Sequence, residues 1–141
     1  MKFWDASVIV PLVVHEPASD RLLDMLENDP VMAVWWATPV EVAAAIARRE
    51  RDGAMTLADA TTALQRLRAL GRSWHEVVPS DGLRSTAQRL LRVHPLRAAD
   101  SLQLAAAIAI AGGDPGALEF VCLDQRLADA ALKEGFDVLV P

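Results

Sequence analysis

The 141-residue chain has little that would place it in a membrane or in an oxidising compartment. Its only cysteine is Cys122, so an intrachain disulfide is impossible and a reducing cytoplasm is the expected location. The longest uninterrupted apolar run covers residues 104–111, well short of the roughly 20 residues that a membrane helix needs. The apolar run 8–14 contains Pro11 and leads into a charged segment without a small-residue cleavage site, so we do not expect a signal peptide.

Several familiar catalytic patterns are also missing. His15, His75 and His94 share no metal-ligand spacing, and Ser7 has no partners for a catalytic triad. The chain has only two lysines, one near each end, so it lacks the lysine that a receiver domain carries after a late strand. Ser7 also occupies the place, two residues after Asp5, where a haloacid-dehalogenase-like phosphatase has its second aspartate. These classes are therefore set aside.

The charge is acidic overall but unevenly distributed. The net charge of -5 argues against a protein that holds nucleic acid by bulk electrostatics. Residues 48–97 nevertheless contain ten arginines and five acids, giving this segment +5 and the remainder -10. Arginine side chains suit phosphate groups, although ordinary solvated helix faces explain them as well.

Short apolar segments alternate with helical patterns along the whole chain, which we interpret as one domain over residues 1–141. This alternation predicts a helix-rich α/β fold with a mostly parallel sheet covered on both faces. Residues 3–14 are expected to form a buried strand that leads into a turn, with a break at residues 5–7. Further strands are predicted at 31–36, 74–78, 119–123 and 136–140, and helices at 16–28, 39–52, 56–71, 80–93, 97–111 and 125–134.

Four acids stand where predicted strands end or helices begin: Asp5, Glu41, Asp100 and Asp124. In a parallel sheet the carboxyl ends of the strands and the nearby helix N-termini meet at one edge, where ligands bind. Carboxylates gathered there repel one another and are costly to desolvate, so a divalent cation would stabilise them. The pattern indicates a metal-dependent hydrolase.

Each acid also has a purely structural interpretation. Glu41 fits a capping box with Thr38 as N-cap, and Asp124 and Asp5 could each cap the segment that follows. Asp100 begins a helix with almost no polar company, so either Arg97 or a cation would have to balance its charge. Helix capping alone does not require the four acids to face one edge, whereas the ligand hypothesis does.

The flanks of these acids resemble those of the PIN-domain ribonucleases, and within them the VapC-type toxins of bacterial toxin–antitoxin pairs. Four parts of the chain carry the resemblance, in order and over nearly its whole length. They are Phe-Trp-Asp-Ala-Ser at 3–7, Trp-Ala-Thr-Pro-Val-Glu-Val at 36–42, Arg-Ala-Ala-Asp-Ser-Leu-Gln-Leu-Ala-Ala-Ala at 97–107, and residues 120–131 with 135–138.

The resemblance implies a three-layer α/β/α domain with four to five short strands and one acidic pocket. It implies Mg²⁺, or Mn²⁺, and endonucleolytic hydrolysis of RNA. Asp5 and Asp100 would be the principal metal ligands, with Glu41 and Asp124 completing the cluster. The family often has Ser or Thr two residues before the fourth acid, where this chain has Cys122.

The resemblance further implies a homodimer and a cognate VapB-like antitoxin whose tail covers the active site. Two other functions share these features. A non-catalytic PIN-like module that binds RNA or protein would keep the fold without the chemistry, and a DNA-directed nuclease would use the same acidic pocket.

Overall fold

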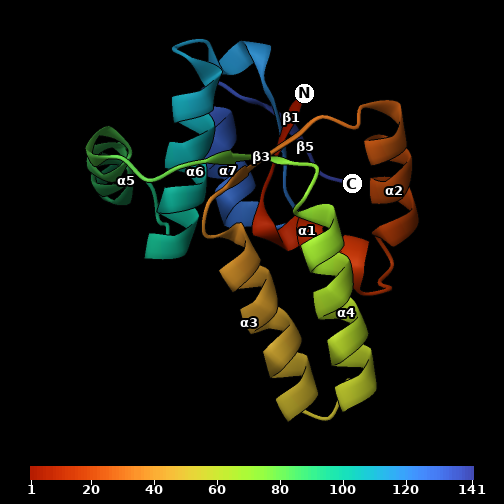
Figure 1. The fold of residues 1–141 in the computed structure, drawn as a ribbon. Helices are drawn as coiled ribbons and strands as arrows, with labels where there is room; N and C mark the ends of the chain where they lie inside the picture. Colours follow the sequence, from red (N-terminus) through yellow and green to blue (C-terminus); the bar gives the residue numbers. More distant parts are fainter.

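The computed structural model describes all residues, 1–141, around a five-stranded sheet (Figure 1). The strands are β1 (Lys2–Trp4), β2 (Met32–Trp35), β3 (His75–Val77), β4 (Glu119–Val121) and β5 (Asp137–Leu139). They are arranged in the order β3-β2-β1-β4-β5, and every neighbouring pair is parallel. All five strands therefore end at the same edge.

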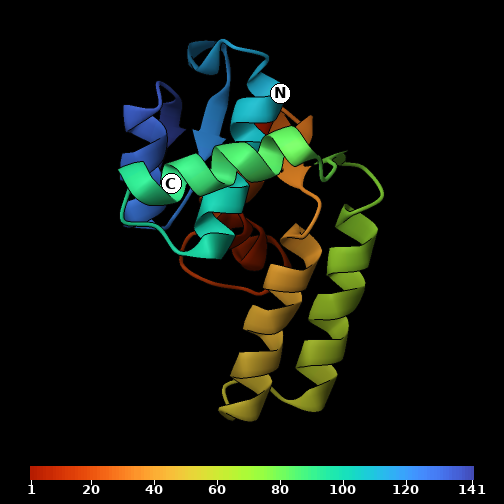
Figure 2. The same ribbon diagram turned by 90° about the vertical axis from the view of Figure 1, so that its left-hand side faces the viewer.

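Seven α-helices connect the strands and cover both faces of the sheet (Figures 1 and 2). In Figure 1, α5–α7 lie on the left of the sheet, and α1–α4 lie to the right and below. The helices are α1 (Ala6–Val13), α2 (Ser19–Asn28), α3 (Thr38–Arg51), α4 (Leu57–Leu70), α5 (Asp81–Val93), α6 (Ala98–Ala111) and α7 (Gln125–Lys133), with a 3₁₀ turn at Pro115–Ala117. None of these helices has the length and apolar character needed to cross a membrane.

The alternation of side chains along the strands creates two separate cores. Phe3 faces the α5–α7 side, where its ring stacks on Phe120 with centroids 5.3 Å apart. The next residue, Trp4, points to the opposite face and packs among α1–α4. Both residues are fully buried. The predicted three-layer α/β/α class with four to five parallel strands is confirmed.

One part of the predicted element order is wrong. Residues 3–14 do not form a strand leading into a turn: β1 stops at Trp4, and residues 6–13 are a helix. The helix α1 is apolar on nearly all sides, with six of its eight residues buried. A short segment that is apolar all round gives the same sequence pattern as a buried strand, so periodicity did not separate the two.

Helices α3 and α4 form a hairpin that projects away from the sheet (Figures 1 and 2). Both helices pack against α1, and the turn that joins them contains Gly53, which has a positive φ of 76°. The start of α4 is fixed by a capping box, in which Thr56 and Asp59 exchange side chain-to-backbone hydrogen bonds. The hairpin thus extends the surface without contributing strands.

Candidate active site

Three short connections bring acidic residues to the carboxyl edge of the sheet. Asp5 directly follows β1, and Asp124 follows β4, the neighbouring strand. The backbone N–H of Asp5 still donates to the carbonyl of Val121 at 3.1 Å, so β1 and β4 stay paired up to the acid. Glu41 lies in the first turn of α3, the helix that follows β2. The parallel topology is what places them together.

Asp5 is the most buried of the four acids, with 4% of its surface exposed. Its Oδ2 accepts a hydrogen bond from the backbone N–H of Ser7 at 3.0 Å, which caps α1 as the sequence allowed. Burial raises the pKa of Asp5 above its ordinary value, and the charge of Asp100 raises it further, against the opposing hydrogen bonds from Ser7. Keeping the Asp5 carboxylate ionised in this position therefore costs free energy.

Glu41 does not cap its helix, so the capping-box interpretation with Thr38 is wrong. Thr38 is already the first helical residue and Ala37 is the N-cap, with no side-chain cap bond. The Oε1 atom of Glu41 instead accepts from Nε2 of Gln103 on α6, at 3.1 Å. Desolvation raises the pKa of Glu41 to about 7, with Asp5 and Asp100 adding to the rise and Gln103 opposing it.

Asp100 stabilises the start of α6 through the backbone rather than through the Arg97 side chain. Its Oδ2 accepts from the backbone N–H of Arg97 at 3.3 Å. Burial raises its pKa and the charge of Asp124 adds to the rise, while the Arg97 backbone N–H and the Arg97 and Arg126 guanidiniums oppose it. Arg97 therefore offsets only part of the electrostatic cost of the Asp100 carboxylate, which leaves the other predicted partner, a cation, a role.

Asp124 is the exposed member of the cluster. Its Oδ1 accepts from the backbone N–H of Leu127 at 2.9 Å and caps α7, as the structural interpretation predicted. Asp124 and Asp100 line a cleft of about 300 Å³ together with Arg97, Gln125 and Arg126, and no apolar side chain lines it. The second carboxylate oxygen of Asp124 makes no hydrogen bond within the chain.

The four predicted acids therefore lie near one another at the carboxyl edge of the sheet, and two of them, Asp100 and Asp124, line the cleft there. Electrostatic repulsion links Asp5 with Asp100, Glu41 with both, and Asp100 with Asp124. No three acidic, histidine or cysteine side chains are already arranged around a common point that could hold a metal ion. The donor set still suits Mg²⁺, which binds through hard oxygens, commonly uses only one or two carboxylates and keeps several waters.

Cys122 stands behind this pocket and is completely buried. Its sulfur lies 3.7 Å from Oδ2 of Asp5 and accepts from the backbone N–H of Asp124 at 3.2 Å. Burial, reinforced by the charge of Asp5, raises the pKa of the thiol, which keeps it protonated and able to donate. The thiol thus makes the contacts that a hydroxyl would make at this position.

Two further side chains of the site were not predicted as functional. Ser7 accepts from the backbone N–H of Leu123 at 2.9 Å and joins α1 to the loop before Asp124. Gln103 joins α6 to α3. The sequence did contain a signal for Gln103, because it is a lone amide in an otherwise apolar helical segment.

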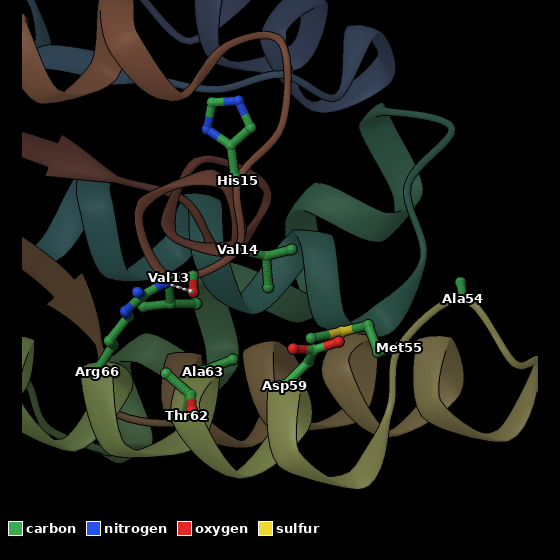
Figure 3. A pocket seen from close by; sticks show the side chains of 9 residues that line it. All are labelled: Val13, Val14, His15, Ala54, Met55, Asp59, Thr62, Ala63 and Arg66. Atoms are coloured by element: carbon green, nitrogen blue, oxygen red, sulfur yellow. Dashed lines mark hydrogen bonds between the residues drawn. The ribbon is translucent and has the colours of Figure 1, made fainter.

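A larger pocket, of about 340 Å³, lies away from the acids, between the α1–α2 connection and α4 (Figure 3). Its only acid is Asp59, which belongs to the Thr56 capping box. Arg66 reaches across to the carbonyl of Val13 at 3.4 Å, and His15 stands at the rim (Figure 3). With one carboxylate already used in a cap, this pocket lacks the donors of the acidic edge.

Comparison with known proteins decides the family. The sequence profile of the PIN domain matches residues 2–132, which include all four acids. The chain belongs to the PIN domain family. A search of curated proteins found no match for the sequence.

Solved structures resemble this chain at the level of the fold. One is described as a toxin-antitoxin complex from Klebsiella pneumoniae (TM-score 0.69, 16% identity, covering 99% of this chain and 97% of that one). Another is FitAcB from Neisseria gonorrhoeae (TM-score 0.66, 15% identity, 99% and 97% covered). A third is PAE2754 from Pyrobaculum aerophilum (TM-score 0.64, 18% identity, 92% and 83% covered).

Proposed function

We propose that this PIN domain is a metal-dependent endoribonuclease that acts as a VapC-like toxin. The observation that carries the proposal is that Asp5, Glu41, Asp100 and Asp124 gather at the carboxyl edge of the sheet: Asp100 and Asp124 line one cleft, and the buried carboxylates of Asp5, Glu41 and Asp100 repel one another. A protein gains no stability from buried carboxylates that raise one another's pKa, so a role with a bound cation is the natural reason to keep them.

Asp5 and Asp100 would hold the ion, Mg²⁺ or Mn²⁺, with Glu41 and Asp124 completing the cluster directly or through water. When bound, the ion supplies a water of lowered pKa and neutralises charge that develops on a phosphate. The chain's own contribution is orientation: each of the four acids commits one oxygen to a fixed hydrogen-bond donor. Fixed carboxylates hold an ion without reorganising during the reaction.

Arginines at the mouth of the pocket offer a place for the substrate. Arg97 and Arg126 line the same cleft as Asp100 and Asp124. A guanidinium can bind two phosphate oxygens at once, so these side chains suit the phosphodiester backbone on either side of the scissile bond. The acidic protein would thus present its positive groups where a nucleic acid must approach.

The test is a cleavage assay with RNA and single-stranded DNA side by side, in Mg²⁺, in Mn²⁺ and in EDTA. We expect RNA cleavage that needs the metal and is lost in Asp100→Asn, whereas Asp81→Asn, an exposed acid on α5, leaves it intact. Cleavage of DNA but not of RNA would change the proposed substrate from RNA to DNA. Metal-independent cleavage, or full activity in Asp100→Asn, would reject the assigned site, and the absence of cleavage under every condition would favour the non-catalytic binding module.

The partners follow from the same proposal. A cognate VapB-like antitoxin would cover the acidic pocket, in keeping with the toxin-antitoxin description of one structural neighbour. The chain is further proposed to form a homodimer in the cytoplasm. Size-exclusion chromatography with light scattering tests the dimer. The antitoxin is tested by looking for a short reading frame directly upstream and by asking whether the protein it encodes co-purifies with this chain.

A further inference from the structure

A glutamine in the middle of an apolar helix needs a reason. Gln103 lies on α6 next to Leu104 and is completely buried. Burying an amide costs free energy unless its donors and acceptor find partners. Leucine or methionine would fill the same space without that cost, and leucine already occupies the neighbouring positions 102 and 104.

Both hydrogen bonds of Gln103 go to the beginning of α3. Its Nε2 donates to Oγ1 of Thr38 at 3.1 Å and to Oε1 of Glu41 at 3.1 Å. Residues far apart in sequence are thereby joined, because α6 carries Asp100 and α3 carries Glu41. The amide thus bridges the two helices that bring these acids to the pocket.

The remaining polar atom of Gln103 is left without a partner. Its Oε1 is buried and accepts no hydrogen bond. The reverse orientation of the amide would point that oxygen at the carboxylate of Glu41, where two acceptors repel each other. Leaving this oxygen without a donor costs free energy, but it allows the N–H groups to face Glu41 and Thr38.

We infer that Gln103 is a positioning residue that holds Glu41 inside the acidic pocket; this inference rests on the proposed function. Glu41 is repelled by Asp5 and Asp100, and its side chain has no other hydrogen bond in the chain. The Gln103 amide occupies Oε1 and leaves Oε2 for an ion or its water. Partners behind a metal ligand commonly contribute 10–100-fold to metal affinity.

The experiment measures Mn²⁺ binding by isothermal titration calorimetry in the wild type and in Gln103→Leu, at fixed pH. We expect the dissociation constant to rise about 10–100-fold. Ser101→Ala is the matched control, because Ser101 is equally buried on α6 but its hydroxyl donates only to Ala98 O of its own turn. Gln103→Met serves as a second variant if the branched leucine packs badly.

A double-mutant cycle separates positioning from a general structural effect. If Gln103 acts through Glu41, Gln103→Leu weakens Mn²⁺ binding no further in a Glu41→Gln background. Equal losses in both backgrounds, or an unchanged affinity in Gln103→Leu and Gln103→Met, overturn the inference and leave the proposed function standing. A wild type that binds no Mn²⁺ overturns the proposed function together with the inference.

Discussion

The acidic edge of the sheet and the pocket beside the α3–α4 hairpin place their carboxylates in different environments. At the hairpin, Asp59 is exposed and its carboxylate is used in a local cap with Thr56. At the sheet edge, Asp5 and Glu41 are pressed together with Asp100 although burial raises the pKa of each. The hairpin pocket is the more voluminous of the two, yet only the sheet edge brings several carboxylates together. Electrostatic cost, rather than pocket size, is therefore the basis on which we propose the acidic edge as the functional site.

The strongest test of this difference is to replace aspartate by asparagine in both regions. Asp5→Asn should lower metal-dependent RNA cleavage by on the order of 10³-fold or more, because it removes a carboxylate that we propose as a principal metal ligand. The Asn side-chain oxygen still accepts from Ser7, and one buried charge is gone, so the metal-free protein should unfold at an equal or higher temperature. Asp59→Asn is the control: it should leave cleavage unchanged, and it should lower the unfolding temperature slightly because the first turn of α4 loses a favourable negative charge. Equal activity losses in the two variants would contradict the distinction.

The second prediction concerns pH and the metal-free protein. Glu41 has a folded-state pKa of about 7, above its ordinary value of 4.5, so the folded state binds the proton more tightly than the unfolded state does. The contribution of Glu41 to stability should therefore fall as pH rises from about 4.5 to about 7, by about 3 kcal/mol at most and by less because solvent screens this half-buried carboxylate. Urea unfolding at a series of pH values measures this slope. Glu41→Gln should flatten it, and a slope of the opposite sign would refute the account.

A third prediction tests the mouth of the acidic cleft. Arg126→Ala should raise KM for RNA roughly three- to tenfold with a smaller change in kcat, because we propose that the guanidinium binds substrate phosphate rather than the reacting atoms. Arg51→Ala, an exposed arginine at the end of α3, provides the control in the hairpin. Steady-state kinetics with a short RNA distinguishes the two. An equal rise in KM for both would mean that diffuse positive charge, rather than the cleft, binds the substrate.

Cys122 offers a finer test behind the acids. Cys122→Ser keeps a donor and an acceptor near Asp5 and Asp124, so cleavage should stay within about threefold of the wild type while the buried site loses some packing, about 1 kcal/mol. Cys122→Val keeps the packing but removes the acceptor for the backbone N–H of Asp124. The valine variant should therefore be the less active of the two and the serine variant the less stable. The reverse ranking of activities would show that the thiol only fills space.

The smallest effect on activity is expected at the hairpin cap. Thr56→Ala removes the side-chain acceptor for the Asp59 backbone N–H and should lower the free energy of unfolding by about 1 kcal/mol. Cleavage per folded molecule should not change, since the cap lies outside the acidic edge. Thermal melting and the cleavage assay, run on the same preparation, measure both quantities. Serine at position 56 should restore the lost stability.

Much of the fold could be read from the sequence because the signals were local. Apolar strands alternating with capped helices predicted the parallel sheet, and Thr56, Ser80 and Gly112 mark helix ends where they were expected. The failure at residues 6–13 has a clear cause, since a short helix buried on nearly all sides lacks the one-sided periodicity that distinguishes it from a strand. The 3₁₀ turn at Pro115–Ala117 was likewise too short to leave a periodic signal.

The roles of the acids were likewise predictable from the sequence where their partners are local and not where their partners are remote. Capping by Asp5 and Asp124 involves backbone groups two or three residues away, so short-range spacing was enough to suggest it. The fate of Glu41 depended on Gln103, 62 residues further along the chain, and the local pattern around Thr38 therefore suggested a cap that does not form. A local motif competes with every long-range partner that folding brings near, and only the folded chain contains those partners.

The sequence by itself determined which residues carry negative charge, that they stand at strand ends and helix starts, and hence that a parallel sheet would collect them. The tertiary structure decided how deeply each acid is buried, which donor holds it and which neighbours repel it. Those quantities depend on distances between segments that are remote in the chain, so only the folded chain brings the four acids to one edge and buries Asp5 and Glu41 beside a third carboxylate.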